Sequence, residues 1–324
     1  SELPKYGGTF VQAEDELAAV SLALGFAYSG HLAVTGSSGP GLSLKSEALG
    51  WAVMAEIPLI VINVQRGGPS TGLPTNIEQS DLMQAIYGSH GDAPRVIIAP
   101  RDVEDCFYTA LEAARVAKEY SVPVIILTDQ ALATRIEAFD EPDLAPLVKD
   151  PTPAAPGSVI NSGTYPTVTG LEHDEMGHPT ANPALHMQMT ARRRDKLKSF
   201  GESLNRPPVH GDEEGDILLI SWGSPYGPTK EAVNRMRKAG QKCGHLHLRH
   251  LHPLPPELER VFARYRQIFV IEMNDQGLYG YGQLATLLRA RYANPAIRSI
   301  TKTDGLGYKT QEVTEGVKRL CGEA

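Results

Sequence analysis

The sequence predicts an α/β protein built from two parallel-sheet domains, and three observations lead to this fold class. Short apolar runs alternate with helical patterns along the first 130 residues, and the same alternation resumes at Asp216. The expected strands are continuously apolar, as in parallel sheets that helices cover on both faces. The length of 324 residues corresponds to about two domains, each large enough for its own core.

The first domain is expected over residues 1–150, where each apolar run ends at a turn or helix signal. Its strands are expected at residues 9–13, 32–35, 59–64, 95–99 and 122–127, with helices at 15–28, 42–55, 77–87 and 103–119. The opening residues resemble the end of a helix and lead directly into a strand. The first strand–helix unit of this domain is therefore expected to be missing.

Residues 151–213 are expected to form an extended crossover, because prolines and glycines crowd them and so long a connection is normally functional or a linker. Within it, only residues 185–200 have a helical pattern. The second domain is expected over residues 214–324. Its strands are expected at 217–222, 245–248 and 268–272, and its helices at 229–239, 257–265 and 283–292.

Composition and charge exclude several classes of function. The 31 basic and 38 acidic side chains give a net charge of −7, which argues against nucleic acid or an anionic membrane as the main partner. The longest apolar run, residues 57–64, is too short to span a bilayer, and the first residues lack a signal-peptide layout. The three cysteines form no C-x-x-C pair, so a reduced cytoplasm is the expected compartment.

Polar residues gather in loops that follow the first strands, at the edge where open parallel sheets place their sites. Glu14, Asp15 and Glu16 open the first expected helix. Acidic residues there meet the positive end of the helix dipole, so one or two of them are expected to be caps. A carboxylate at a strand end can also relay protons, although propensity alone makes capping about three times more frequent.

The second loop, residues 35–41, is rich in glycine and lies between a strand and a helix. Its amide groups could hold an anion or a planar ligand. Leu44 stands where a dinucleotide fingerprint needs its third glycine, and Lys45 lies outside the spacing of a P-loop. A dinucleotide-dependent dehydrogenase is therefore disfavoured.

The third loop, residues 64–75, places Arg66 at a strand end beside glycines and hydroxyls. An arginine there suits a two-pronged grip on a carboxylate or phosphate. A surface arginine paired with a neighbouring acid is an equally good interpretation.

Two histidine-rich stretches suggest metal ligands less strongly. His245 and His247 would share one face of a strand, but a polar strand face is about five times the more frequent reason for such a pattern. Residues 172–178 combine acids and histidines within the crossover, and we expect them to make loop contacts and bind no metal.

Together and in this order, these loops resemble the 2-oxoacid:ferredoxin oxidoreductase family, and within it the α subunit of the 2-oxoglutarate branch. The two most specific stretches are RGGPSTGLPT at residues 66–75 and TGLEHDEMGH at residues 169–178. Further matching stretches are QAEDELAA at 12–19, TGSSGPGLSL at 35–44, SHGD at 89–92, WGSPYGP at 222–228 and HLHLR at 245–249.

The resemblance implies a thiamine-diphosphate pyrimidine-binding domain followed by a transketolase C-terminal-like domain. It assigns Glu16, nine residues before Gly25, as the glutamate that reaches N1′ of the aminopyrimidine, with Glu14 as the fallback. The residues expected to line the pyrimidine are Ser37, Ser38, Gly39 and Pro40. Arg66 and Thr75 match family positions that hold the carboxylate and carbonyl end of a 2-oxoacid.

The sequence departs from the family pattern in two places. The Tyr-Pro-Ile-Thr-Pro segment, which in the family supplies a threonine that contacts the 2-oxoacid, is absent, so the chain is expected to be a fragment or one piece of a longer polypeptide. The G-D-G…N pattern that holds the diphosphate and Mg²⁺ is also absent, which implies a partner. A β subunit is therefore expected to bring the diphosphate site, its Mg²⁺ and a [4Fe–4S] cluster, with no metal on this chain. The implied reaction turns 2-oxoglutarate, coenzyme A and oxidised ferredoxin into succinyl-CoA, carbon dioxide and reduced ferredoxin. The alternatives are pyruvate or a branched-chain 2-oxoacid as substrate, or a non-catalytic scaffold subunit.

Overall fold

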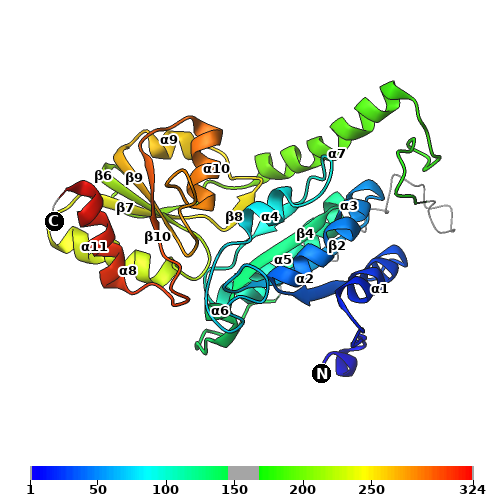
Figure 1. Ribbon diagram of the computed structural model, residues 1–324, viewed down its shortest axis with the longest axis horizontal. Helices are drawn as coiled ribbons and strands as arrows, with labels where there is room; N and C mark the ends of the chain where they lie inside the picture. Colours follow the sequence, from blue (N-terminus) through cyan, green and yellow to red (C-terminus); the bar gives the residue numbers. More distant parts are fainter. Residues whose placement is uncertain (1, 145–167, 323–324) are drawn as a thin grey trace.

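The structure is a computed structural model that describes residues 2–144 and 168–322. Figure 1 shows two α/β halves side by side, and the long helix α7 (Pro183–Ser203) runs from the crossover toward the junction between them. Each half contains one five-stranded sheet. The α/β class with two mostly parallel sheets, expected from the sequence, is confirmed.

The sheet of the first half has the order β1-β2-β4-β3-β8. Four strands are parallel, and β8 pairs antiparallel with β3. Its strands are β1 (Val34–Ser37), β2 (Leu59–Gln65), β3 (Val96–Ile98), β4 (Pro123–Asp129) and β8 (His250–His252). Its helices are η1 (Leu3–Tyr6), α1 (Glu16–Tyr28), α2 (Gly39–Leu44), α3 (Ser46–Met54), α4 (Leu82–Tyr87), α5 (Val103–Tyr120) and α6 (Gln130–Thr134).

The sheet of the second half has the order β10-β9-β6-β7-β5, with only β5 antiparallel to its neighbour. Helices α8 and α11 cover one face, and α9 and α10 cover the other (Figure 1). The strands are β5 (Val209–Gly211), β6 (Gly215–Ser221), β7 (Cys243–His247), β9 (Tyr265–Glu272) and β10 (Ile297–Thr301). The helices are α8 (Tyr226–Lys238), α9 (Leu258–Phe262), α10 (Gln283–Tyr292) and α11 (Thr310–Cys321).

Three sequence-based elements differ in the structure, each for a local reason. Residues 9–13 are no strand, because they are largely exposed and pair with no other strand among the described residues. The expected helix 42–55 is two helices, α2 and α3, which meet at Lys45. The expected helix 77–87 begins only at Leu82, because the preceding backbone bonds to the other half: the Ile77 amide donates to the Gly305 carbonyl.

The core is continuous across the junction between the halves. One cluster of buried side chains contains Leu127 of β4 and also Leu218, Trp222 and Leu246 of the second half, all fully buried. Burial of this kind contributes about 25 cal/mol per Å² of apolar surface. The two sheets are therefore held together by the same hydrophobic contacts that stabilise each of them.

The junction also contains a strand exchanged between the halves. Strand β8 follows β7 of the second sheet but adds to the edge of the first sheet, and the Ala99 amide donates to the Arg249 carbonyl at 2.8 Å. Arg249 then forms an ion pair with Asp105 of α5 at 2.8 Å and another with Glu112. We call this set of contacts, β8 with Arg249 and helix α5, the β8 junction.

Glu112 is the centre of the charges in the β8 junction. Its carboxylate pairs with both Arg249 and His250, and the His250 Nε2–Glu112 Oε1 distance is 2.7 Å. Burial alone would raise the pKa of Glu112, but the hydrogen bonds and charges of His250 and Arg249 outweigh it and lower the pKa to about 2. The carboxylate is therefore ionised and fully paired.

Within the described ranges, 2–144 and 168–322, we find no helix with the length and apolar character that crossing a membrane requires.

Candidate functional site

The carboxyl ends of both sheets face one connecting segment, residues 76–81. The Gln79 side chain donates from Nε2 to the Trp222 carbonyl at the end of β6, and its Oε1 accepts from the Met273 amide after β9. The Asp81 amide donates to Oε1 of Gln65 at the end of β2. In open α/β sheets, ligands bind outside the carboxyl ends of the strands. Two such edges meet here.

A cavity of about 1100 Å³ opens at this meeting point and takes its walls from both halves. Small and polar residues outnumber large apolar ones among those that line it. From the first half come Gly39, Pro40, Ser43, Arg66, Gly67, Gly68, Pro69, Ser70, Leu73, Glu78, Ser80, Asp81, Met83 and Gln84; from the second half come Asp275, Gly277, Tyr281, Gln283, Thr286 and Thr303. We call it the interdomain cavity.

The three carboxylates before α1 have three different surroundings. Asp15 is the helix cap, because its Oδ1 accepts from the Ala18 amide at 2.7 Å. Glu14 is exposed to solvent. Glu16 is partly buried, and its side chain lies over the α-carbon of Gly41. Of the three, only Glu16 contacts the glycine-rich loop in a way that capping does not explain.

Gly41 has no room for a side chain at this contact. A β-carbon there would lie 1.8 Å from Ser37 Oγ and 2.8 Å from Glu16 Cγ. A glycine is therefore required if Glu16 and Ser37 are to approach the loop this closely. Within the described residues, no hydrogen bond to the Glu16 carboxylate is formed, so the carboxylate can accept a proton or a hydrogen bond from a ligand.

The opposite side of the loop contacts Asp81. A β-carbon on Gly39 would lie 3.2 Å from Asp81 Oδ2, and the same oxygen accepts from Asn63 Nδ2 at 2.8 Å. Burial raises the pKa of Asp81, while the hydrogen bond from Asn63 and the charge of Arg66 act in the opposite direction. The glycine-rich loop thus lies between two acidic side chains, Glu16 on one side and Asp81 on the other.

Arg66 lines the interdomain cavity at the end of β2. Its Nε atom is buried and has no hydrogen-bond partner among the described residues. The loop that follows is closed on itself, because the Leu73 amide donates to the Gly67 carbonyl at 2.9 Å. A buried guanidinium nitrogen without a partner costs free energy unless a ligand satisfies it. This geometry fits a bound carboxylate.

Of the other site residues expected from the sequence, some line the interdomain cavity and others do not. Gly39 and Pro40 line the interdomain cavity, whereas Ser37 and Ser38 are half-buried behind it. Thr75 is exposed and does not line the cavity. The structure therefore brings Arg66 and the loop together but does not bring Thr75 to them.

Three residues at the site were missed from the sequence. Asp81 and Gln283 lie outside the matched stretches, and the Gln283 side chain joins the halves by donating to the Ser80 carbonyl at 2.7 Å. Lys45, which lies outside the spacing of a P-loop, is fully buried, and the charges of Glu16 and Asp15 act on it. A lysine within an otherwise apolar helix face was the one signal that could have identified it.

His245 and His247 do not form a metal site. Both rings bond to the same hydroxyl, with Ser221 Oγ at 2.7 Å from His245 Nε2 and 3.0 Å from His247 Nδ1. Burial lowers the pKa of His245 to about 3, so its ring is neutral. The expected polar strand face is in fact buried, because Tyr226 packs over both rings. No group of three possible metal ligands occurs in the described part of the chain.

The acidic and histidine-rich stretch 172–178 makes loop contacts, as expected. Glu172 pairs with Arg193 of α7 at 2.9 Å and with His186 at 2.5 Å, and Asp174 accepts from the His178 amide. These contacts fasten the crossover to α7.

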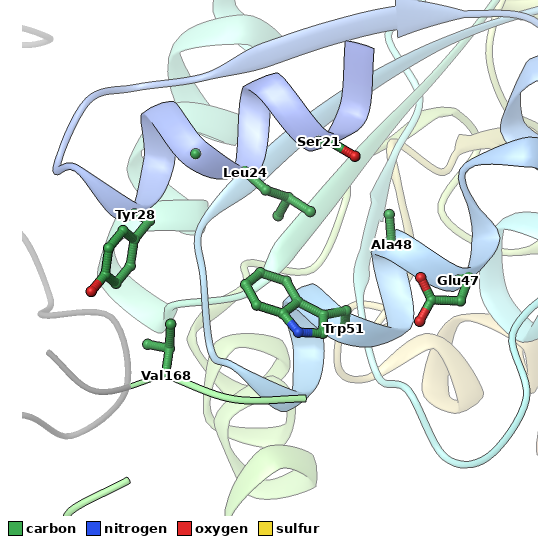
Figure 2. A pocket seen from close by; sticks show the side chains of 8 residues that line it. Ser21, Leu24, Tyr28, Glu47, Ala48, Trp51 and Val168 are labelled. Carbon is green, nitrogen blue, oxygen red and sulfur yellow. The ribbon is translucent and has the colours of Figure 1, made fainter. Parts of the chain in front are cut away.

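A second hollow of about 410 Å³ lies behind α1 and is separate from the interdomain cavity. Figure 2 shows Leu24 of α1 facing the Trp51 ring of α3, with Tyr28 and Val168 at one end and Glu47 at the other. None of the site residues expected from the sequence lines it. Its walls are mainly apolar and present few groups that could take part in a reaction.

Fold and geometry together define a class of protein: an α/β protein of two halves with a candidate ligand site between the carboxyl ends of two mostly parallel sheets. A family described as pyruvate flavodoxin/ferredoxin oxidoreductase, thiamine-diphosphate-binding, matches residues 2–193. The pyruvate:ferredoxin oxidoreductase core domain II matches residues 215–315. The chain belongs to the 2-oxoacid:ferredoxin oxidoreductase family.

Two curated relatives illustrate the similarity. The 2-oxoglutarate oxidoreductase subunit KorA of Mycobacterium tuberculosis is 43% identical over 93% of this chain and 48% of its own length. The 2-oxoglutarate synthase subunit KorA of Methanothermobacter marburgensis is 36% identical over 84% of this chain and 77% of its own. The chain thus spans about half the length of the mycobacterial relative.

Solved structures agree on the fold. The 2-oxoglutarate:ferredoxin oxidoreductase of Magnetococcus marinus, a structure with 2-oxoglutarate, coenzyme A and succinyl-CoA bound, superposes with a TM-score of 0.86 at 36% identity. The match covers 98% of this chain and 58% of that one. A split-gene transketolase superposes with a TM-score of 0.57 at 11% identity. This match covers 94% of this chain and 80% of the transketolase chain, and it shows the fold alone.

Proposed function

We propose that the chain is the catalytic α portion of a thiamine-diphosphate-dependent 2-oxoglutarate:ferredoxin oxidoreductase. The observation that carries the proposal is the contact of Glu16 with Gly41 and Ser37, which presents an unpaired carboxylate at the glycine-rich loop. The relatives named as 2-oxoglutarate oxidoreductase and 2-oxoglutarate synthase subunits support the choice of substrate. We also infer the domain limits expected above, residues 1–150 and 214–324, joined by the crossover 151–213.

In this proposal Glu16 faces N1′ of the aminopyrimidine and exchanges a proton with it. A carboxylate beside a ring nitrogen is held in place by the shared proton, as general acid–base catalysis requires. When bound, thiamine diphosphate supplies the carbanion chemistry of the reaction, while the protein supplies orientation and charge. Ser37, Ser38, Gly39 and Pro40 form the wall against which the ring would lie.

Arg66 holds the carboxylate end of the 2-oxoacid, and its unpaired Nε atom supports this role. A guanidinium presents two parallel donors to a carboxylate, which fixes the orientation of the acid as well as its charge. Thr75 is assigned to the same end of the substrate from the family position alone. Reaching it requires movement of the exposed end of loop 66–75.

The remaining parts of the site are assigned to a β subunit. Among them are the diphosphate site with its Mg²⁺ and the [4Fe–4S] cluster, because this sequence has no G-D-G…N pattern and its three cysteines lie far apart. Coenzyme A accepts the acyl group and ferredoxin accepts the electrons. Purification of the full-length protein together with a brown, cluster-containing second subunit would support this arrangement, whereas full activity without one would contradict it.

The proposal is tested by Glu16→Gln and Glu14→Gln in the full complex, with ferredoxin reduction by 2-oxoglutarate as the assay. Glu16→Gln should lower kcat about 100-fold or more, because general acid–base groups contribute roughly two to four orders of magnitude. Glu14→Gln should leave kcat within about twofold. The reverse pattern would assign the role to Glu14. If neither change affects kcat, the chain is a non-catalytic scaffold subunit.

The same assay identifies the substrate. Comparison of kcat/KM for 2-oxoglutarate, pyruvate and a branched-chain 2-oxoacid should favour 2-oxoglutarate. A preference for either of the others would keep the chemistry and change the assigned substrate.

A further inference from the structure

Lys45 is a buried cation whose charged atom has no partner in the described structure. It stands between α2 and α3, its side chain is 0% exposed, and its Nζ forms no hydrogen bond within the described residues. A buried ammonium normally pairs with an acid, because leaving water costs several kcal/mol. An unpaired one calls for an explanation.

Two partly buried lysines show how this fold satisfies such a charge elsewhere. Lys196 of α7 donates to Glu56 Oε1 at 2.7 Å and to the Ser121 carbonyl at 3.1 Å. Lys302 likewise pairs with Glu312 at 2.7 Å. Lys45 therefore differs from these two lysines, which have structural partners.

The charges that act on Lys45 come from the start of α1. Burial lowers the pKa of Lys45, while the carboxylates of Glu16 and Asp15, in that order, act to raise it. The Asp15 carboxylate is already engaged with the Ala18 amide as the helix cap. Glu16 forms no hydrogen bond among the described residues and lies over Gly41, whose carbonyl accepts from the Lys45 amide at 3.1 Å.

We propose that Lys45 is a positioning residue that keeps the Glu16 carboxylate directed over Gly41, ready for its ligand. The inference rests on the function proposed above for Glu16. Lys45 follows Gly41 by one helical turn of α2, and a fixed cation limits the orientations of a nearby carboxylate. Lys45 itself contacts no reacting atom in this scheme, because its ammonium is enclosed by the chain.

The first test needs no cofactor and measures coupling through stability. Thermal unfolding is compared for the cofactor-free complex of full-length subunits carrying Lys45→Met, Glu16→Gln or both. Removal of a buried unpaired charge should leave Tm unchanged or raise it. The gain should be larger by about 2–4 °C in the Glu16→Gln background, where Lys45 has lost its acid. Equal gains in both backgrounds would show that the two residues do not interact.

The second test follows exchange of the C2 proton of bound thiamine diphosphate for deuterium, a step that precedes substrate. Lys45→Met should slow this exchange about tenfold, because the acid that faces the cofactor is then less well oriented. In the Glu16→Gln background the same change should alter the exchange rate by less than about twofold. KM for 2-oxoglutarate should not change. A purely structural role would slow exchange equally in both backgrounds.

Lys196→Met is the matched control, because it also removes an enclosed cation, but a partly buried one that pairs with Glu56. It should lower Tm and leave the exchange rate within about twofold. An unchanged exchange rate in Lys45→Met, with a slowed one in Glu16→Gln, would overturn the role of Lys45 alone. An unchanged rate in Glu16→Gln would instead overturn the function proposed for Glu16.

Discussion

Two groups of buried charges lie at the junction of the halves, and they are satisfied differently. In the β8 junction, Arg249 contacts two acids and the Thr109 hydroxyl, and Glu112 pairs with both Arg249 and His250. Around the interdomain cavity, Asp81 accepts from Asn63, whereas Arg66 Nε has no partner in the described structure. A fully paired group stabilises the fold, whereas an incompletely paired one is available to a ligand. The next three changes test this distinction.

The largest expected effect is on stability and belongs to the β8 junction. Arg249→Met should lower the free energy of unfolding by about 3 kcal/mol, because it leaves two buried acids without their cation. Urea unfolding with an unchanged m-value measures it. Arg115→Met, on the same helix α5 but in an exposed pair, should have no measurable effect. Equal losses in the two variants would mean that the junction is no stronger than a surface pair.

The second largest effect is expected when the pH is lowered, which should also destabilise the β8 junction. The pKa of Glu112 is about 2 in the folded chain against an ordinary value of 4.5. A depressed carboxyl pKa contributes stability that is present above pH 4.5 and is lost as the pH falls toward 2, here on the order of 2 kcal/mol. In Glu112→Gln this part of the pH dependence should disappear. If the wild type and the variant lose stability in parallel, the contribution of Glu112 is disproved.

The smallest effect is expected at the cavity and should appear in binding alone. Arg66→Lys should raise KM for the 2-oxoacid about tenfold, equivalent to 1.4 kcal/mol, since lysine lacks the two-pronged geometry. The unfolding free energy should not fall, because Arg66 Nε has no structural partner to lose. Arg260→Lys, at an exposed position, is the control for KM. A stability loss with an unaltered KM would make Arg66 a structural residue.

The sequence predicted most strands of both sheets, because continuous apolar runs such as residues 59–64 have few alternatives in a fold of this kind. It did not predict β5 and β10 of the second sheet or helix α11. It failed where pairing depends on distant residues. Residues 9–13 look like a strand locally but find no neighbour among the described residues. Residues 250–252 were missed because three alternating residues next to β7 contain no information about the sheet that they join.

The sequence predicted which loops form the candidate site, but it did not predict which buried charges lie around those loops. Motif resemblance singled out Glu16 and Arg66, and the structure places Arg66 on the interdomain cavity and Glu16 against the loop that lines it. It could not single out Asp81 or Lys45, whose importance comes from burial beside charges that are distant in the chain. Spacing to Gly25 favoured Glu16 and kept Glu14 as the fallback, and in the structure only Glu16 of the two contacts Gly41.

Strand β8 has a consequence for how the protein can be cut and how it can move. A fragment that ends before residue 215 would leave the outer edge of β3 with unsatisfied amides and carbonyls, a surface that recruits other chains and promotes aggregation. The shared strand also prevents the halves from swinging apart as rigid bodies. Access to the interdomain cavity must therefore depend on its surface loops, such as residues 66–75 and 275–281, and amide hydrogen exchange should be faster there than in β8.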